Sequence, residues 1–483
     1  MNLGGVFFLL GRLLLALSVA LFIPATVAYF SDGRIELVAF LLSGGIAAAT
    51  GVFLERKFVQ RQEFSFGRNE AFVLVAAAWL VATMVGTLPY VFIKGPAFAI
   101  NGIFESVSGF TTTGASILPD VESEPRSILL WRALTHWLGG MGIIVLGIAI
   151  LPKLAIGGME LLGAEAPGPI KEKLTPRLAQ TGKALWGIYM LFTAAEVLIL
   201  RVLGLGLFDA VTHSFATMAT GGFSTKNASI AAFDNPAVEM TIVIFMLIAG
   251  ASFALHFHWI RGRARPLLRD PEFRLYIGIV AVGSLLIASD LLWQRTYVGV
   301  GSAVRFAVFQ VSTIVTTTGF ATTDFDAWPD FSRAVLFVLM FVGGCAGSTG
   351  GSVKVVRILI VVKKVAVDLR RIVRPHAMLP LRIGTKSIPE DIVSAVTTFF
   401  LLFLGLFTAG GLLLTLMGMD ALSAFSASAA CLGNIGPGFG AVGPTMNYAA
   451  LPGLAKLLLA LMMIVGRLEL YTILVLFFLR RRA

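Results

Sequence analysis

Short apolar segments that end in a glycine-containing turn constrain this fold more than any other feature of the sequence. The clearest copy is the segment 304–315, which is followed by TTTGF at 316–320. A helix needs roughly 20 residues to cross the hydrocarbon core of a bilayer, so this segment is too short to span one. Irregular backbone at membrane depth persists where it is buried in protein or lines a water-filled path. The turn therefore predicts backbone carbonyls that face such a path, as in filters that replace the hydration shell of an ion.

The same pattern occurs four times. The other copies are TTTGA at 111–115 after the segment 97–110, ATGGF at 219–223 after 207–218, and LGNIGP at 432–437 after 421–431. Their glycines, Gly114, Gly222, Gly319 and Gly436, lie 108, 97 and 117 residues apart. Glycine permits backbone angles that a residue with a Cβ resists. Four like turns at similar spacing indicate an internal repeat, and they predict one ring with pseudo-fourfold symmetry around an ion pore.

Composition places the chain in a membrane. Hydrophobic residues make up 57% and charged residues 13% of the sequence, whereas soluble domains carry about 25% charged residues. The net charge of +11 agrees with the Lys and Arg that cytoplasmic loops of membrane proteins collect. We expect no nucleic-acid binding, because basic and aromatic residues are not interleaved as such binding needs. The two cysteines, Cys345 and Cys431, stand in apolar surroundings and indicate neither a disulfide framework nor a metal site.

The expected fold is an all-α polytopic membrane protein with an N-terminal hairpin and four helix–pore-loop–helix repeats. The predicted spanning helices are 3–30 and 36–54, then the pairs 71–93 and 128–151, 184–205 and 238–260, 275–293 and 334–362, and 392–417 and 454–479. These ten helices divide the chain into a hairpin, 1–68, and repeats at 69–182, 183–270, 271–388 and 389–483.

Charge sets the predicted orientation. Every second loop is basic, and these loops carry, among others, Arg56, Lys57, Arg61, Arg68, Lys153, Lys171, Lys173, Arg177, Lys183, Arg261, Lys363 and the terminal Arg480, Arg481 and Arg482. The loops that hold the turns have fewer cations. The positive-inside rule then predicts that both termini are cytoplasmic and that all four turns lie near the outer face.

A candidate gate follows the third turn. The second helix of repeat three is interrupted at 343–352 by Gly343, Gly344, Gly347, Ser348, Gly350 and Gly351. Each glycine destabilises a helix by about 1 kcal/mol relative to alanine, which favours an intramembrane loop that obstructs the pore; the alternative is a helix interface of small residues. Arg467, beside Glu469 in the last predicted helix, is expected to act as an electrostatic barrier to cations, or else to form a structural ion pair.

The chemistry of the ring favours a weakly hydrated monovalent cation. Each short helix directs its negative C-terminal dipole at the turn, and no ring of carboxylates marks a calcium filter. Glu105 and Asp209 sit at different offsets from their turns, so we expect them to pack by hydrogen bonds; we expect packing roles for His136, His213 and Glu196 too. We find no constellation of catalytic groups, and therefore expect no enzyme.

Together, the turns, the glycine-rich stretch 343–352 and VGRLEL at 465–470 resemble the Trk/Ktr/HKT superfamily of potassium transporters, most closely its bacterial TrkH/TrkG branch. The resemblance covers nearly the whole chain. The extra N-terminal hairpin is similar to that of TrkH rather than the shorter KtrB.

This resemblance implies a multi-pass homodimer in the bacterial inner membrane, in which each protomer has its own pore for potassium uptake. It also implies a cytosolic TrkA-like ring that binds NAD or ATP/ADP and controls the gate. The chain itself has no glycine-rich loop between a strand and a helix. We therefore expect it to bind no cofactor, and K⁺ is its transported ion.

The matching motifs of this family also indicate which residues would form an ion-selectivity filter. The resemblance implies that the ion-contacting carbonyls belong to Thr112, Thr113, Thr220, Gly221, Thr317, Thr318, Asn434 and Ile435. In plant relatives a serine in place of the first filter glycine accompanies sodium preference, so Gly114 favours potassium. Turns two and four depart from Thr-Thr-Gly, which makes the ring asymmetric. A proton- or sodium-coupled symporter using the same site remains the alternative.

Overall fold

A computed structural model describes residues 3–59, 67–149, 174–263, 265–374, 379–384 and 386–479. In these ranges the chain is helical, apart from connecting loops and one antiparallel pair of two-residue strands, β1 Arg382–Ile383 and β2 Lys386–Ser387. Several basic residues used for the predicted orientation lie outside the described residues: Arg61, Lys153, Lys171, Lys173, Arg480, Arg481 and Arg482.

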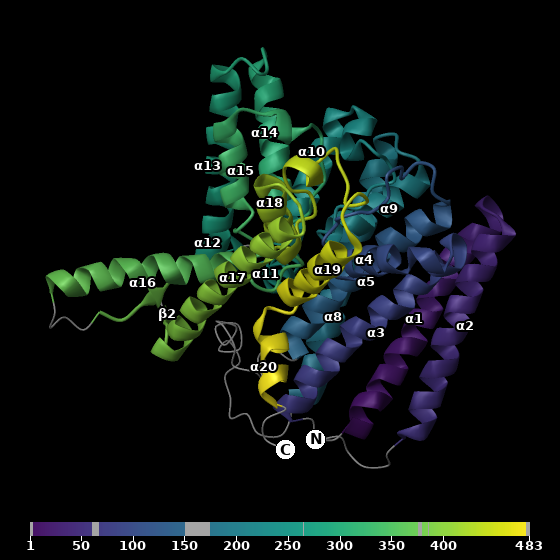
Figure 1. Ribbon diagram of the computed structural model, residues 1–483. Helices are drawn as coiled ribbons and strands as arrows, with labels where there is room; N and C mark the ends of the chain where they lie inside the picture. The colour runs from purple at the N-terminus through teal and green to yellow at the C-terminus, as the bar shows by residue number, and fades with distance from the viewer. Residues whose placement is uncertain are drawn as a thin grey trace.

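The N-terminal hairpin consists of α1 (Leu3–Ser31) and α2 (Arg34–Lys57), at the right edge of Figure 1. Both helices match the predicted hairpin. Gly11 and Gly51 let the two backbones approach closely, because a Cβ on either would lie within 3.0 Å of the carbonyl oxygen of the other. At the far end Asp32 accepts hydrogen bonds from the amides of Arg126 (3.0 Å) and Ser127 (2.8 Å). The hairpin thereby caps the start of the next unit's second helix.

Four units follow, each with a long helix, a short helix and a second helix or pair of helices. Unit one comprises α3 (Arg68–Lys94), η1 (Pro96–Phe98), α4 (Ala99–Phe110) and α5 (Arg126–Ala149). Unit two comprises α8 (Leu174–Val202), α9 (Leu207–Met218), η2 (Ser229–Phe233), α10 (Pro236–Gly250) and α11 (Phe253–Ile260). Unit three comprises α12 (Arg265–Arg269), α13 (Pro271–Trp293), α14 (Val300–Val315), η3 (Phe325–Ala327), α15 (Asp330–Leu339) and α16 (Val355–Val373). Unit four comprises α17 (Glu390–Leu416), α18 (Ala421–Leu432), η4 (Gly440–Val442), α19 (Gly453–Arg467) and α20 (Tyr471–Leu479).

Length and apolarity identify the membrane spans. Within the described ranges, six helices are long and apolar enough to cross a bilayer, and α10 with α11 makes a seventh if that bent pair is one span. Four helices, α4, α9, α14 and α18, have 12 to 16 residues and are too short to cross. The chain is therefore a helical membrane protein in which short helices lie between spanning ones.

Two helices predicted to be continuous are broken, which corrects the sequence interpretation. The range 238–260 bends by 105° between α10 and α11. The range 454–479 is interrupted after Arg467, where Glu469 and Leu470 adopt positive φ angles of 56° and 53°. Tertiary contacts account for the first break, because the carbonyl oxygens of Ala249 and Gly250 accept hydrogen bonds from the third unit instead of continuing the helix.

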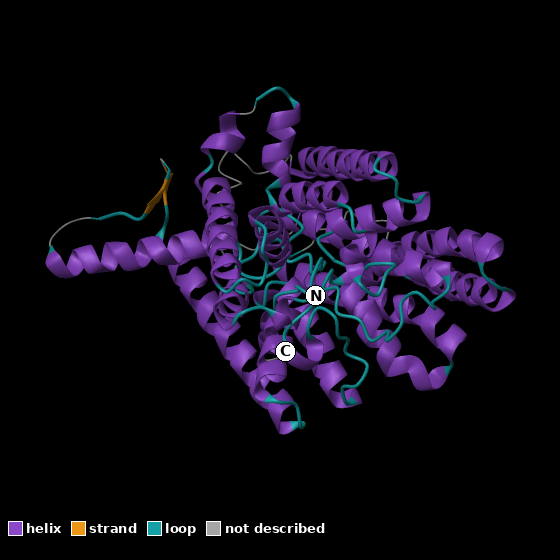
Figure 2. Ribbon diagram, turned by 90° about the horizontal axis from the view of Figure 1, so that it is seen from above, coloured by secondary structure: helices purple, strands orange, loops and turns teal. Residues whose placement is uncertain are grey.

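The predicted interruption in the second helix of unit three is present. Residues 340–354, between α15 and α16, contain no helix. Figure 1 shows α16 extending sideways, away from the rest of the molecule. Seen from above, loop segments gather near the centre of the molecule with helices around them (Figure 2).

Candidate functional site

The four glycine-containing turns share one backbone conformation. In each, a residue with a side chain takes the left-handed conformation just after the short helix: Thr112, Thr220 and Asn434 with φ 53°, and Thr317 with φ 59°. Two residues later comes the predicted glycine, also with positive φ: Gly114 and Gly222 at 79°, Gly319 at 83° and Gly436 at 101°. The sequence interpretation assigned the unusual backbone angle to the glycines alone and missed the threonines and the asparagine.

A shared hydrogen-bond pattern explains this conformation. The amide after each left-handed residue donates to the carbonyl five residues earlier, in the bonds Thr113–Ser108 (2.9 Å), Gly221–Ala216, Thr318–Thr313 and Ile435–Ala430 (2.8 Å each). This is the Schellman arrangement that closes helix C-termini, usually with glycine in the left-handed position. A β-branched residue there costs about 1–3 kcal/mol and persists where its surroundings over-determine it. Such strain clusters at functional sites.

The turns also contact one another in a closed cycle. The glycine of each turn packs against the next turn so closely that an added Cβ would lie under 3.0 Å from a backbone carbonyl oxygen there. That oxygen belongs to the residue just before the next turn's glycine. The pairs are Gly114 with the carbonyl of Gly221, Gly222 with that of Thr318, Gly319 with that of Ile435, and Gly436 with that of Thr113. The order runs one, two, three, four and back to one. All four oxygens belong to the set predicted to contact an ion. The structure therefore brings segments from across the whole chain into one ring.

A cavity of about 140 Å³ adjoins the ring. It is lined by all four filter glycines and by polar groups that include Ser116, Arg132, Ser224, Lys226 and Asn227. A larger cavity of about 710 Å³ lies between α13 and α15, but its lining residues are apolar or glycine. Of these two cavities, the smaller one is lined by polar residues and adjoins the turns.

Threonine hydroxyls give turns one and three the same side-chain network. Thr111 and Thr113 share a hydrogen bond of 2.8 Å, and so do Thr316 and Thr318. Asn434 of turn four donates to the hydroxyl of Thr113 at 2.9 Å, and so joins the last turn to the first. The departures from Thr-Thr-Gly in the sequence thus coincide with a different set of side-chain contacts.

The glycine-rich stretch of unit three packs directly against the helix ends that carry the turns. The Thr349 hydroxyl donates to the Met218 carbonyl at 3.1 Å, and the Gly351 amide donates to the Thr317 hydroxyl at 2.6 Å. A Cβ on Gly351 would also meet the carbonyl oxygen of Gly433 within 3.0 Å. The stretch is therefore in contact with turns three and four and with the last residue of α9, the helix that carries turn two, and small residues are needed for the approach.

The remaining residues of the predicted gate make hydrogen bonds near the ends and the centre of this stretch. Their contacts are Gly343 amide to Val353 carbonyl (2.9 Å), Val355 amide to Gly344 carbonyl (3.2 Å), Phe253 amide to Gly347 carbonyl (3.1 Å), Ser348 hydroxyl to Cys345 carbonyl (2.6 Å), and the Lys354 ammonium to the Gly350 carbonyl. We call residues 340–354 the glycine loop. Its backbone is held at several points by neighbouring units.

Arg467 lies beside the glycine loop. Its guanidinium is buried and donates through one nitrogen to the Thr349 carbonyl at 2.7 Å. Glu469, the partner considered from the sequence, instead accepts a 2.5 Å hydrogen bond from Arg357. Arg467 therefore fastens the loop directly, while the ion pair beside it is made by another arginine.

The polar residues inside the short helices form a pattern that the sequence interpretation missed. Glu105 and Asp209 do accept hydrogen bonds, from Ser116 and Thr225 among others, as expected. The residue that shares the offset of Glu105, however, is His213: each precedes its filter glycine by nine residues. Comparing all polar residue types at equal offsets, rather than acids alone, would have exposed this register.

These features define a class: a helical membrane protein in which four short helices end at a ring of closely packed turns. The sequence matches the TrkH family model, described as cation transport protein, over residues 44–481, and the chain belongs to this family.

The curated relatives agree with this assignment. The chain is 42% identical to the Trk system potassium uptake protein TrkH of Escherichia coli K12, with 97% of each chain covered. It is 35% identical to TrkG of the same strain, covering 97% of this chain and 96% of that protein. The crystal structure of the potassium transporter TrkH from Vibrio parahaemolyticus matches with a TM-score of 0.90 and 37% identity, over 99% and 98% of the two chains. These relatives are named as transport proteins and not as enzymes.

Proposed function

We propose that this chain takes up potassium across the bacterial inner membrane through a gated, channel-like ring of backbone carbonyls. The observation that carries the proposal is the closed cycle of contacts among four turns with one backbone conformation. The relatives are named potassium uptake proteins, which supports potassium as the transported ion.

The physics of the ring favours a monovalent cation. Each short helix ends at its turn, so the equivalent of about half a negative charge lies at each of four helix termini. Carbonyl dipoles replace the hydration shell of a weakly hydrated ion, and selectivity depends on their number, field strength and spacing. The oxygens we assign to this role belong to the eight filter residues named from the sequence.

Regulation completes the proposal. The glycine loop lies against turns three and four and the end of α9, and it is fastened by Arg467, so its displacement would open the path. We infer that a cytosolic TrkA-like ring with bound nucleotide moves this loop, that the chain works as a homodimer, and that both termini are cytoplasmic. The basic loops predicted to face the cytoplasm would contact such a partner.

Substitution of one filter glycine tests the proposal. Gly319→Ser adds atoms toward the carbonyl oxygen of Ile435, whereas Gly405→Ser in α17 meets open space and serves as the control. In cells without other potassium uptake, Gly405→Ser should support growth at low potassium and Gly319→Ser should not, at equal membrane levels. Equal growth of both variants would contradict a filter at this ring.

Coupled symport with protons is the second candidate, and one buried residue favours it. The imidazole of His136 is buried, stacks on Phe223 at 4.0 Å, and lies where a Cβ on Gly221 would fall. Among the described residues neither ring nitrogen makes a hydrogen bond of ordinary geometry, although the backbone of Ser108 acts on the ring. If His136 couples proton movement to potassium uptake, His136→Gln will remove any effect of a pH gradient on flux.

A further inference from the structure

Three of the four short helices place a polar side chain nine residues before the filter glycine. These residues are Glu105, His213 and Gln310, and all three are fully buried. The equivalent position in α18 is Ala427, which is flanked by two buried serines, Ser426 and Ser428; Ser428 donates to the Phe407 carbonyl, whereas Ser426 bonds across the turn. Burying a polar group is costly unless it is hydrogen-bonded, so a recurrent buried polar position calls for a partner.

The partners lie just beyond each glycine. His213 Nε2 is 2.9 Å from the Ser224 hydroxyl, and Gln310 Nε2 donates to the Thr322 hydroxyl at 3.3 Å. Ser426 plays the same part in unit four, where its hydroxyl accepts from the Phe439 amide at 2.9 Å. Each bond runs from a short helix to a residue two or three positions after the filter glycine. Each therefore closes the backbone around its turn.

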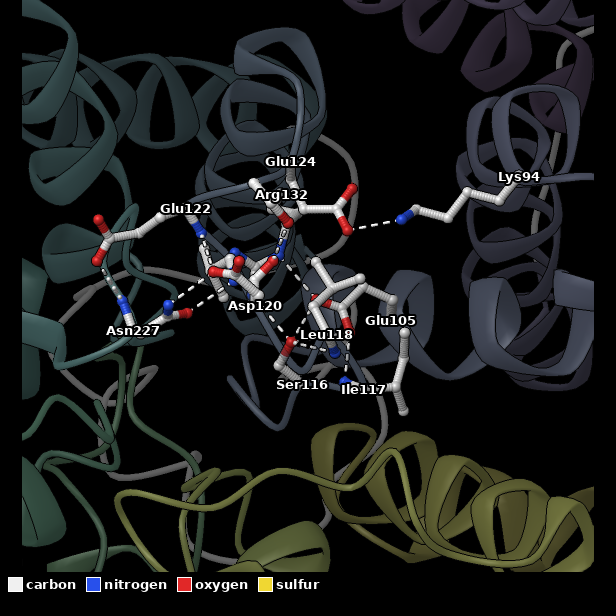
Figure 3. Close-up of polar contacts among 12 residues, drawn as sticks. Lys94, Glu105, Ser116, Ile117, Leu118, Asp120, Glu122, Glu124, Arg132 and Asn227 are labelled. Atoms are coloured by element: carbon white, nitrogen blue, oxygen red, sulfur yellow. Dashed lines mark hydrogen bonds and ion pairs between the residues drawn. The ribbon is translucent and has the colours of Figure 1, made fainter.

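Unit one has the most extensive version of this contact (Figure 3). Glu105 accepts from the Ser116 hydroxyl at 3.0 Å, from the Ile117 amide at 2.9 Å and from Arg132 Nε at 2.7 Å. Ser116 follows Gly114 by two residues, as Ser224 follows Gly222. The carboxylate thus holds the segment after the first turn by two donors, and a third, charged donor comes from α5.

Arg132 extends this contact to the second turn. Besides Glu105, its guanidinium donates to the Ser116 hydroxyl at 3.1 Å and to the Ser224 carbonyl at 3.2 Å. It also lies 4.1 Å from the centre of the Phe223 ring. One buried ion pair on α4 and α5 thereby fixes turn one relative to turn two, next to the cavity that adjoins the ring.

We propose that Glu105, His213, Gln310 and Ser426 are positioning residues that fix the aperture of the ring and thereby set its preference for potassium over sodium. We call them the bracing residues. The inference rests on the proposed function. Ion preference depends on where the carbonyls are placed. Without a hydrogen bond across the turn, the segment after the glycine could move and bring the carbonyls closer to a smaller ion. The hydrogen bond from the bracing residue resists this movement.

Unit three offers a simple test, because both partners of its hydrogen bond, Gln310 and Thr322, are uncharged. Gln310→Met removes the donor at similar volume, and Thr322→Val removes the acceptor. In proteoliposomes we expect each variant to lower the potassium-to-sodium permeability ratio about fivefold, a change equivalent to about 1 kcal/mol. The double variant should lower it no further, because coupled partners are not additive. Ser312→Ala is the control, since that buried hydroxyl has no hydrogen-bond partner among the residues described.

Unit one adds a charge-dependent test. Glu105→Gln leaves Arg132 buried without its counter-charge beside the cavity, so potassium flux should fall together with selectivity. The double variant Glu105→Gln with Arg132→Gln should recover flux but not the permeability ratio. If either protein does not reach the membrane, the unit-three variants still decide the proposal.

The outcomes separate this inference from the proposed function. A wild-type protein whose reversal potential ignores potassium would overturn the function itself. Selective wild-type conduction, with permeability ratios within about twofold of wild type in Gln310→Met and Thr322→Val, would leave the function standing and overturn the bracing role. Additive effects in the double variant would also overturn it, because independent sites add.

Discussion

Replacing Arg467 with alanine removes the side chain that fastens the glycine loop at the Thr349 carbonyl. A hydrogen bond from a charged donor contributes about 1.5–3 kcal/mol. Because a factor of ten corresponds to 1.4 kcal/mol, its loss shifts the closed-to-open ratio of the loop by about ten- to one hundred-fold. The variant also loses a buried positive charge that repels cations. On the function proposed above, we expect both effects to raise potassium flux.

Flux of a potassium tracer into proteoliposomes measures this prediction. Arg467→Ala should conduct at least about tenfold faster than wild type without a regulator. Arg467→Lys keeps the positive charge but loses the planar arrangement of guanidinium donors. Its flux should fall between those of the wild type and Arg467→Ala. Arg201→Gln is the matched control, because Arg201 also donates to a backbone carbonyl, that of Leu205 at 3.2 Å, but is exposed and outside the ring.

The refuting result is equally direct. An Arg467→Ala protein that melts at the wild-type temperature but conducts at or below the wild-type rate would show that Arg467 neither fastens the loop nor opposes cations. A rise in flux that Arg201→Gln reproduces would point to a general loosening of the fold instead.

Three further perturbations follow from the same structure. Thr317→Val removes the hydroxyl that accepts from the Gly351 amide at 2.6 Å, so tracer flux should rise about fivefold, less than for Arg467→Ala, because a neutral hydrogen bond contributes about 1 kcal/mol. Glu272 accepts from the amide of Ala346 within the glycine loop at 2.7 Å and from that of Val356 in the first turn of α16 at 3.0 Å. Replacement of Glu272 by alanine should raise flux and lower the melting temperature, whereas replacement by glutamine should preserve both better. The hydrogen bond from Asn227 is the main cause that lowers the pKa of Asp120 from 3.8. The stabilisation by this carboxylate is therefore present above that pH and is lost as pH falls below about 4. In Asp120→Asn the melting temperature should fall less steeply as the pH is lowered through this range.

Local sequence signals predicted most of the architecture. Apolar length identified the long helices, and short apolar segments followed by glycine identified α4, α9, α14 and α18 with their turns. These signals are local because hydrophobic length and the demand for positive φ at glycine depend on few neighbours. The run of glycines likewise predicted the interruption between α15 and α16.

Features that depend on distant partners escaped prediction. The break at 251–252 carries no strong local signal, and it exists because the glycine loop takes the carbonyls of α10. The left-handed threonines contradict their own propensity, and the surrounding ring imposes that conformation. The bracing residues differ in type from unit to unit, and Ser426 lies one position earlier than the other three, so their shared role becomes visible when their partners are in view.

Reversal potentials of proteoliposomes containing this protein alone test the central claim most directly. Separate potassium, sodium and pH gradients would be imposed across the membrane. The account predicts a potential that follows the potassium gradient and ignores the other two. A potential that shifts with the pH or sodium gradient, or net transport against a potassium gradient, would contradict a selective pore and require a coupled mechanism.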